Sequence, residues 1–156
     1  MTRTRKLKVL FLCAGNSCRS QMAEGWARAL KSDVLEPFSA GMEARGLDPR
    51  AVKVMAEAGV DLRRQESKTV HRFKGERFDF VVTVCSGTGE SCPVFPGKVK
   101  VIHAGFDDPP ELARGAETEE AALEHYRRVR DEIRAFVERL PETPADGRER
   151  KTTSAG

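Results

Sequence analysis

Apolar and polar residues follow two different periodicities along this chain. Four short, mostly apolar segments predict buried β-strands, at residues 8–12, 34–39, 78–84 and 98–102. In three longer segments the apolar residues recur every three or four positions, which predicts helices at about 19–30, 49–59 and 118–140. Strands and helices therefore alternate along most of the chain.

Local capping signals set further helix boundaries. Asp48 followed by Pro49 is typical of a helix start, and Gly59 is typical of the position just beyond a helix end. Ser67 is a candidate N-cap for a shorter helix that contains Val70 and Phe73.

The alternation of elements predicts the fold class. We expect a three-layer α/β sandwich with a four-stranded parallel sheet, formed by residues 1–140 as one domain. Residues 141–156 are polar and rich in Pro, Gly and Thr, which predicts a disordered tail. In sheets of this kind, ligands bind at the carboxyl ends of the strands.

Length and charge narrow the functional classes. A chain of 156 residues suits one compact domain, and 27 basic against 24 acidic residues give a formal charge of +3, too small and too evenly spread for a nucleic-acid surface. The first apolar run is too short for a signal peptide, and no segment reaches the roughly 20 apolar residues that cross a bilayer. We therefore expect a cytoplasmic, monomeric enzyme that acts on a small anion.

The segment between the first strand and the first helix carries the strongest chemical signal: Cys13-Ala14-Gly15-Asn16-Ser17-Cys18-Arg19-Ser20. Gly15 and Asn16 tolerate unusual backbone angles, so the loop can turn its N–H groups toward a tetrahedral oxyanion at the helix N-terminus. Arg19 adds a planar fork for two anion oxygens. Cys13 would lie at the base, where these groups favour the thiolate. Residues 13–19 are thus predicted to bind an oxyanion, and Cys13 to attack it.

Two other predicted strands also end in reactive groups. Cys85 follows the third strand, and Phe106-Asp107-Asp108-Pro109 follows the fourth. An aspartate there could protonate the oxygen that leaves the anion. The cysteine spacings, C-x4-C and C-x6-C, are not those of common zinc sites. The segment from Cys85 to Cys92 contains two glycines and no large apolar residue, which suits successive thiol–disulfide exchanges.

In these features the chain resembles the thioredoxin-coupled arsenate reductases, which are built on the low-molecular-weight protein tyrosine phosphatase fold. The matching segments are residues 13–20, Ser39-Ala40-Gly41, Cys85 to Pro93, and Gly105 to Pro109, within a resemblance that covers about residues 7–140. The resemblance implies that Cys13 attacks arsenate held by its loop and Arg19. It also implies that Asp108 protonates the departing oxygen and that Ser20 helps to hold Cys13 as thiolate.

The resemblance further implies a relay of three thiols. Cys85 would attack the adduct of Cys13 with arsenic, which releases arsenite and leaves a Cys13–Cys85 disulfide. Cys92 would then resolve this bond into Cys85–Cys92, and thioredoxin would reduce it as electron donor. Cys18 matches no redox role in the family and is interpreted as structural. No tightly bound cofactor and no metal site are implied for this relay.

Two other classes of function remain open. A tyrosine phosphatase would use Cys13, Arg19 and Asp108 to hydrolyse phosphate monoesters through a phosphocysteine, but it has no evident use for the C-x6-C pair. Phosphatases of this fold usually carry an aromatic residue after Asp-Pro, where this chain has Pro110. The third class is a redox sensor or metal-binding module without turnover.

One departure from the family concerns potassium. Some of the reductases bind this ion through positions that match Asn16, Glu24 and Ser39, together with an acidic residue where this chain has Lys68. A lysine there would repel the ion. We therefore expect the Lys68 ammonium to take the place of the cation beside Glu24, so that activity is independent of potassium.

Overall fold

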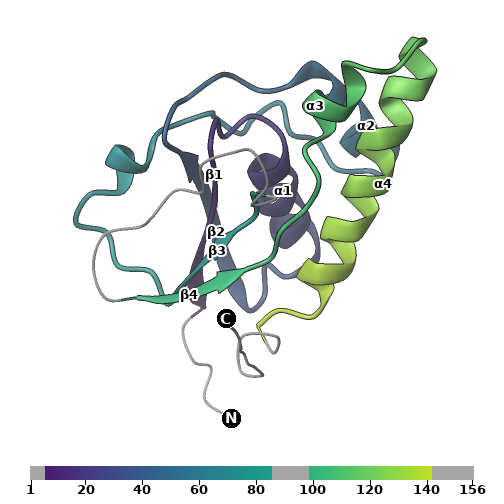
Figure 1. Cartoon of the computed structure of the whole chain (residues 1–156). Coiled ribbons are helices and arrows are strands. Elements are labelled where there is room, and N and C mark those ends of the chain that lie inside the picture. Colours follow the sequence, from purple (N-terminus) through teal and green to yellow (C-terminus); the bar gives the residue numbers. More distant parts are fainter. Residues whose placement is uncertain (1–5, 86–98, 142–156) are drawn as a thin grey trace.

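The computed structural model of the protein describes residues 6–85 and 99–141. Along the chain (Figure 1) the elements are β1 (Leu7–Cys13), α1 (Arg19–Leu30), β2 (Leu35–Gly41), α2 (Pro49–Glu57), the 3-10 turn η1 (Val70–Phe73), β3 (Phe80–Thr83), β4 (Lys100–His103), α3 (Pro109–Ala113) and α4 (Glu119–Glu138).

The four strands form one parallel sheet in the order β2-β1-β3-β4. Leu12 of β1 pairs with Ala40 of β2 on one side and with Thr83 of β3 on the other. The carboxyl ends of these strands therefore lie at the same edge of the sheet. This arrangement confirms the predicted α/β class with a four-stranded parallel sheet.

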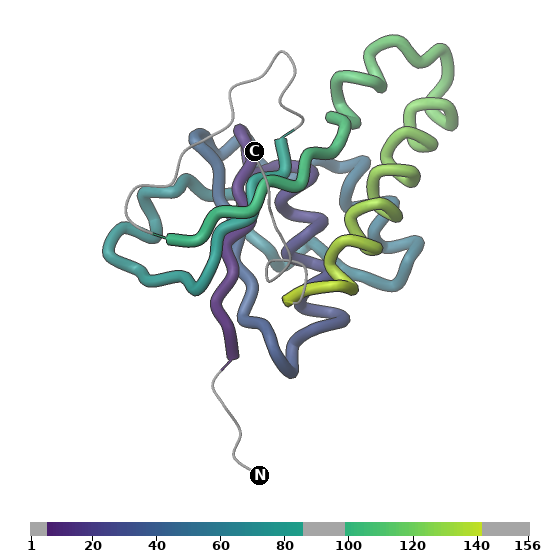
Figure 2. Tube along the Cα trace, turned by 60° about the horizontal axis from the view of Figure 1, so that its bottom comes forward, coloured from purple at the N-terminus to yellow at the C-terminus, as the bar shows by residue number. Residues whose placement is uncertain are grey.

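The larger core lies between the sheet and the helices α1, α2 and α4. Its fully buried residues alternate along β1, as Val9 and Phe11, and recur at helical spacing along α4, as Tyr126, Val129 and Ile133. Helix α4 lies alongside α1, as Figure 2 shows, and the indole N–H of Trp26 in α1 donates to the carbonyl of Arg130 in α4 over 3.1 Å. Trp26 is thus a polar link as well as apolar packing.

The opposite face of the sheet is covered by η1 and its neighbouring loops (Figure 1). Phe38, Phe73 and Phe78 pack edge to face there, with ring centroids 5.4 to 5.6 Å apart. They cover Leu10 and Leu12, the side chains of β1 that point away from the helices. Within the described residues, this third layer is therefore thinner than the helical one.

The observed ends of the helices confirm some capping predictions and correct one. Asp48 caps α2, since its side chain accepts from the N–H of Arg50, and Gly59 takes a left-handed φ of 87° just beyond the helix. The prediction that Ser67 caps the next helix is wrong. That element is a 3-10 turn that follows Thr69, and the Ser67 hydroxyl instead accepts from the N–H of Gly46.

The short helix α3 was not predicted, and it begins directly after Asp108. None of the helices in the described part of the chain is long and apolar enough to cross a membrane. The expected tail falls almost wholly in residues 142–156, which lie outside the described residues, as does Cys92.

Candidate active site

The loop from Ala14 to Cys18 connects β1 to α1 and forms the floor of the candidate site. Cys13 is the last residue of β1 and only 5% exposed, and Arg19 is the first residue of α1. Asn16 adopts a left-handed φ of 49°, which lets the chain reverse tightly before the helix. The Gln21 side chain fixes this residue, because its Nε2 donates to both the backbone oxygen (3.1 Å) and Oδ1 (2.9 Å) of Asn16.

Carbonyl groups of the loop are bonded to the segment that follows β2. The N–H groups of Glu43, Arg45 and Asp48 donate to the carbonyls of Ala14, Gly15 and Ser17, each over 3.0 Å. With these carbonyls engaged, the N–H groups of the loop and of the first turn of α1 are the polar backbone groups suited to an anion. Loop and helix terminus therefore form a site for negative charge.

Gly41, at the end of β2, allows this close approach. A Cβ at this position would lie 2.8 Å from both the carbonyl oxygen of Ala14 and the nitrogen of Asn16, two backbone atoms that could yield only if the loop moved. Glycine is thus required here by contact with the loop rather than by its own φ. This contact gives Gly41, one of the residues that carry the family resemblance, a physical role beside the loop.

Arg19 is buried and directed toward the chain that follows β4. Its Nη1 donates to the carbonyl of Phe106 over 2.9 Å, and its Nη2 lies 3.6 Å from Oδ1 of Asp108. Asp107 points elsewhere, since its carboxylate pairs with Arg128 of α4 at 3.0 Å. Of the two neighbouring aspartates, Asp108 is therefore the one that the structure places beside the anion loop.

A cavity of about 400 Å³ opens above the loop. Its walls are the loop itself, residues 45–49, Asp108, Pro110 and Glu111 of α3, and Arg114 just after that helix. Arg45 and Arg114 are exposed at the margin of this cavity, with side chains 57% and 79% accessible. Both are paired with a glutamate, Arg45 with Glu43 and Arg114 with Glu111, and Asp48, Asp108 and Glu111 also line the cavity. The feature that favours an anionic ligand is therefore the buried Arg19 at the floor, together with the N–H groups of the loop.

Ser20 lies behind the loop in the first turn of α1 and is fully buried. Its Oγ accepts from Nδ2 of Asn16 over 2.9 Å, which leaves the hydroxyl hydrogen to donate. The same Asn16 side chain also accepts a hydrogen bond from Gln21. Ser20, Asn16 and Gln21 therefore belong to one buried hydrogen-bond network behind Cys13.

The cysteines fall into distinct environments. Cys13 and Cys18 form no disulfide, whereas the buried Cys85 is disulfide-bonded. Burial, reinforced by the negative charge of Asp48, raises the pKa of the Cys18 thiol well above its usual value. Cys18 is thus a poor nucleophile, which supports its interpretation as a structural residue.

The positions of β1 and β3 bring two cysteines to the same edge of the sheet. Leu12 pairs with Thr83, and the N–H of Val84 donates to the carbonyl of Leu12 over 3.0 Å. Cys13 directly follows Leu12, and Cys85 directly follows Val84. The structure therefore brings together Cys13, Arg19, Ser20, Asp108 and the strand end that carries Cys85.

The residues beside Asn16 do not fit a bound potassium ion. The Lys68 ammonium lies 3.7 Å from Oε1 of Glu24, and the same oxygen accepts from the Ser39 hydroxyl over 2.5 Å. A lysine in this position supplies positive charge where the ion would need an oxygen ligand. In residues 6–85 and 99–141, no group of three or more His, Cys, Asp and Glu is arranged to hold a metal ion.

Three contributors to the site were not predicted from the sequence. Arg45 comes from a loop without any local motif, and Gln21 carries no pattern beyond its place on α1. Asp48 was assigned only as a helix cap, yet its second oxygen accepts from the hydroxyl of Tyr126 over 2.7 Å. Tyr126 lies on the apolar face of the helix predicted at 118–140, and only its hydroxyl could have indicated a polar partner.

Comparison with known proteins is consistent with this geometry. The sequence profile of the family described as low molecular weight phosphotyrosine protein phosphatase matches residues 8–147. An arsenate reductase of Shouchella clausii (strain KSM-K16) is 48% identical over 135 residues, which cover 86% of this chain and 95% of that protein.

Solved structures with the same fold include both kinds of enzyme. An arsenate reductase in the phosphate binding state superposes with a TM-score of 0.70 and 30% identity, covering 89% of this chain and 98% of the other. A low molecular weight protein tyrosine phosphatase from T. tengcongensis superposes with a TM-score of 0.66 and 25% identity, covering 88% and 99% of the two chains.

Proposed function

This chain belongs to the low molecular weight phosphotyrosine protein phosphatase family, and from that premise we propose that it is an arsenate reductase which uses a relay of cysteine thiols. The observation that carries the proposal is the state of its cysteines. Cys13 at the base of the anion loop forms no disulfide, while the buried Cys85 at the neighbouring strand end is disulfide-bonded. A phosphatase needs the first cysteine but has no use for the second.

The first chemical step is attack on arsenic. The loop and Arg19 hold the arsenate oxygens, and the Cys13 thiolate forms a bond to arsenic while one arsenic–oxygen bond breaks. Asp108, beside Arg19, donates the proton that lets this oxygen leave as water. The Ser20 hydroxyl, held by Asn16, favours the thiolate before the attack. Arsenic remains As(V) after this step.

The second step reduces arsenic. The Cys85 thiolate attacks the sulfur of Cys13, so that a disulfide forms and the electron pair of the sulfur–arsenic bond passes to arsenic. Arsenite, As(III), leaves, and the two thiols have supplied the two electrons. Cys92 then attacks Cys85, which frees Cys13 as thiolate and leaves Cys85 oxidised. A Cys13 outside any disulfide, together with a disulfide-bonded Cys85, is the state that this sequence of steps would leave behind.

We propose thioredoxin as the electron donor that reduces this last disulfide, with no tightly bound cofactor. The proposal includes the remaining expectations from the sequence, namely a monomeric cytoplasmic enzyme without a nucleic-acid or membrane partner. These parts rest on the resemblance to thioredoxin-coupled reductases and on the composition of the chain.

The test is arsenate-dependent NADPH oxidation in the presence of thioredoxin and thioredoxin reductase. We expect Cys13→Ser and Cys85→Ser to abolish turnover. Cys92→Ser should release about one arsenite per protein and then stop, because its Cys13–Cys85 disulfide has no resolving thiol. Cys18→Ala is the matched control, as it removes a buried thiol from the same loop and should keep turnover. Normal turnover of Cys92→Ser would contradict the three-thiol relay.

A second candidate function is hydrolysis of phosphate monoesters, favoured by the family description and by the shared group of Cys13, Arg19 and Asp108. The same proteins should therefore be assayed with p-nitrophenyl phosphate. Strong Cys13-dependent hydrolysis without arsenate reduction would assign the chain to the phosphatases. Weak hydrolysis beside arsenate reduction is expected, because arsenate and phosphate share shape and charge.

A further inference from the structure

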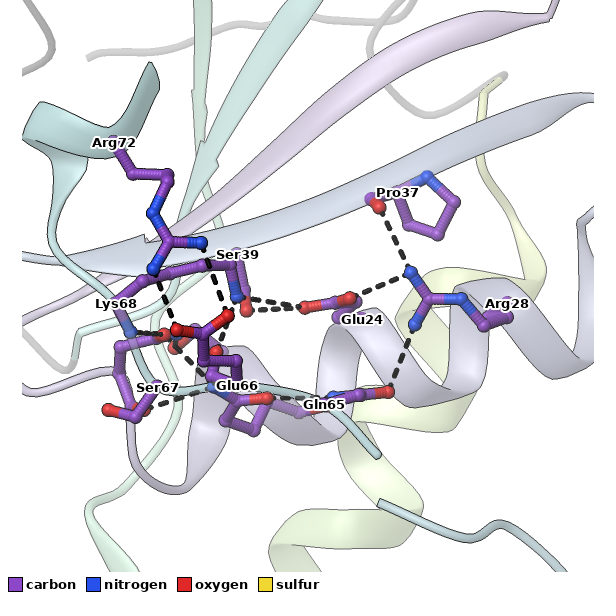
Figure 3. A network of polar contacts seen from close by, with 12 residues as sticks. Glu24, Arg28, Pro37, Ser39, Gln65, Glu66, Ser67, Lys68 and Arg72 are labelled. Atoms are coloured by element: carbon purple, nitrogen blue, oxygen red, sulfur yellow. Dashed lines mark hydrogen bonds and ion pairs between the residues drawn. The ribbon is translucent and has the colours of Figure 1, made fainter. Parts of the chain in front are cut away.

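A buried lysine lies behind the anion loop, outside the groups that touch the substrate in the proposed reaction. Lys68 is only 9% exposed and Glu24, its acidic neighbour on α1, only 5%. The Lys68 ammonium lies 3.7 Å from Oε1 of Glu24 and donates to the carbonyl of Glu66 over 2.6 Å. Figure 3 shows Glu24 between Ser39 and Arg28, with Lys68 on the Ser39 side.

The ammonium of Lys68 is held in a buried position, where the loss of hydration disfavours its charged form. Desolvation lowers the pKa of Lys68, and the charges of Glu24 and Glu66 oppose that shift. Glu24 is fully engaged in turn, since it accepts from Ser39 over 2.5 Å and pairs with Arg28 at 2.7 Å. A neutral side chain in place of Lys68 would remove the buried cation beside this carboxylate and leave only Arg28, whose side chain is half exposed.

The backbone of Lys68 connects this charged cluster to the anion loop. Its N–H donates over 2.8 Å to Oδ1 of Asn16, the loop residue with left-handed φ. Its carbonyl accepts from the N–H of Gly41, the residue packed closely against the backbone of the loop. Asn16 in turn donates to Ser20, behind Cys13. A displacement of Lys68 would thus reach the loop through both Asn16 and Gly41.

We propose that Lys68 is a built-in cation which positions the anion loop: its ammonium anchors the chain to Glu24 and to the carbonyl of Glu66, and its backbone holds Asn16 in the conformation that binds the oxyanion. The role is one of positioning, because the ammonium contacts Glu24 and a carbonyl rather than the anion cavity. An internal ammonium also makes a bound monovalent cation unnecessary. This inference rests on the proposed function for the measurements of arsenate reduction. The measurements of oxyanion binding do not depend on turnover.

The first measurement uses the unmodified, reduced protein. Oxyanion affinity is obtained from the protection of Cys13 against iodoacetamide by arsenate and by phosphate, with the modified residue located by mass spectrometry. Titrations in potassium chloride are compared with titrations in tetramethylammonium chloride of equal ionic strength. We expect the same affinity and the same rate of arsenate reduction in both salts. A potassium stimulation of more than about twofold would overturn the proposal.

Variants then test the role of the charge. Lys68→Met should weaken oxyanion protection of Cys13 by about tenfold or more, the loss typical of removing a group that orients a binding residue. Arg72→Gln is the matched control, because Arg72 pairs with Glu66 in the same segment but is exposed. It should bind oxyanions as the unmodified protein does. Equal protection in Lys68→Met and the unmodified protein would contradict a positioning role.

A charge reversal separates positioning from general destabilisation. Lys68→Asp adds a second carboxylate beside Glu24 and Ser39, which are oxygen ligands suited to a monovalent cation. Its oxyanion binding should be weak in tetramethylammonium chloride and should recover at least about fivefold in potassium chloride, since the external ion replaces the lost ammonium. A merely misfolded protein would not recover. Absence of both arsenate reduction and oxyanion protection in the unmodified protein would instead refute the proposed function.

Discussion

The hydroxyl of Tyr126 donates a hydrogen bond of 2.7 Å to Oδ2 of Asp48, across 78 positions of the sequence. The other oxygen of the same carboxylate caps α2 through Arg50, and the N–H of Asp48 donates to the carbonyl of Ser17 in the anion loop. Helix α4 is thereby tied to the wall of the cavity through one buried hydroxyl. Burial and the neighbouring charge of Asp48 raise the pKa of Tyr126, so this hydroxyl stays a donor throughout the working pH range.

Tyr126→Phe should therefore destabilise the protein while leaving its ring packing intact. The expected loss in the free energy of unfolding is about 1.5 to 3 kcal/mol, the range for a hydrogen bond to a charged group. Urea titration followed by circular dichroism would measure it. Phe136→Leu, a change of an apolar α4 side chain, serves as control for the helix. A free energy unchanged in Tyr126→Phe would show that the hydroxyl contributes nothing to the link.

Gly41→Ala tests the contact between β2 and the anion loop. The added Cβ would lie 2.8 Å from two backbone atoms of the loop, so the loop must shift. We expect arsenate reduction to fall by at least about tenfold, because small displacements of positioned groups are costly in catalysis. The free energy of unfolding should fall by about 1 to 3 kcal/mol, as for other overpacked sites.

The matched control for this change is Gly115→Ala. A Cβ at Gly115 would meet its nearest atom, the carbonyl oxygen of Leu112, at 3.9 Å, which is ordinary contact. This variant should keep both activity and stability. Full activity of Gly41→Ala would show that the loop tolerates displacement, and that close packing against β2 is not what positions it.

Arg45 should assist the capture of the anion rather than the chemical steps. Its exposed guanidinium lies at the margin of the cavity and pairs with Glu43 at 3.1 Å. Arg45→Ala is expected to raise KM for arsenate by about threefold to tenfold, equivalent to a charge interaction of about 1 kcal/mol in a solvated site. The effect should shrink as ionic strength rises, and kcat should stay unchanged.

Arg63→Ala provides the comparison for Arg45, because Arg63 forms an exposed pair with Asp61 two residues away, in the same spacing as Arg45 and Glu43. It does not line the cavity. Steady-state kinetics at several salt concentrations would separate the two variants. Identical KM values and salt dependence in both would argue against any contribution of the cavity margin to capture.

Local signals in the sequence were sufficient for most of the fold. Helix α1 was predicted at 19–30 and occupies Arg19–Leu30, because its apolar face and its loop are both encoded within one short segment. Helix α3 was missed since five residues that begin with two prolines cannot show a helical period. The wrong cap at Ser67 had a similar origin. Its hydroxyl accepts from Gly46, 21 residues away, and no local rule indicates that partner.

The site divides in the same way between local and distant contacts. The loop motif identified Cys13, Arg19 and Ser20, which are neighbours along the chain. Contacts that join distant segments, such as Lys68 to Asn16 across 52 residues, became visible only in the structure. For Lys68 the family resemblance was more informative than the periodicity of the sequence. It indicated that this chain has a lysine where some reductases of the family have an acidic residue, and the structure then showed the ion pair of this lysine with Glu24.

Acid stability should depend in part on Glu57, the last residue of α2. Its carboxylate forms two hydrogen bonds with Arg127 of α4, at 2.9 and 2.8 Å, and these bonds lower its pKa from 4.5 to about 2. A lowered pKa means that the stabilisation is complete above pH 4.5 and is lost as the pH falls toward 2. The side chain is about one third exposed, so we expect at most about 1 kcal/mol.

Urea titrations of the unmodified protein and Glu57→Gln between pH 2 and pH 7 would measure this contribution. The difference between their free energies of unfolding should be constant above about pH 5, shrink as the pH falls from 4.5 to about 2, and then vanish. Glu138→Gln is the control, because its bond to Arg134 lies within α4 and joins no second helix. A difference for Glu57→Gln that stays constant down to pH 2 would mean that the contribution of Glu57 does not depend on its charge, and that the ion pair with Arg127 is not its source.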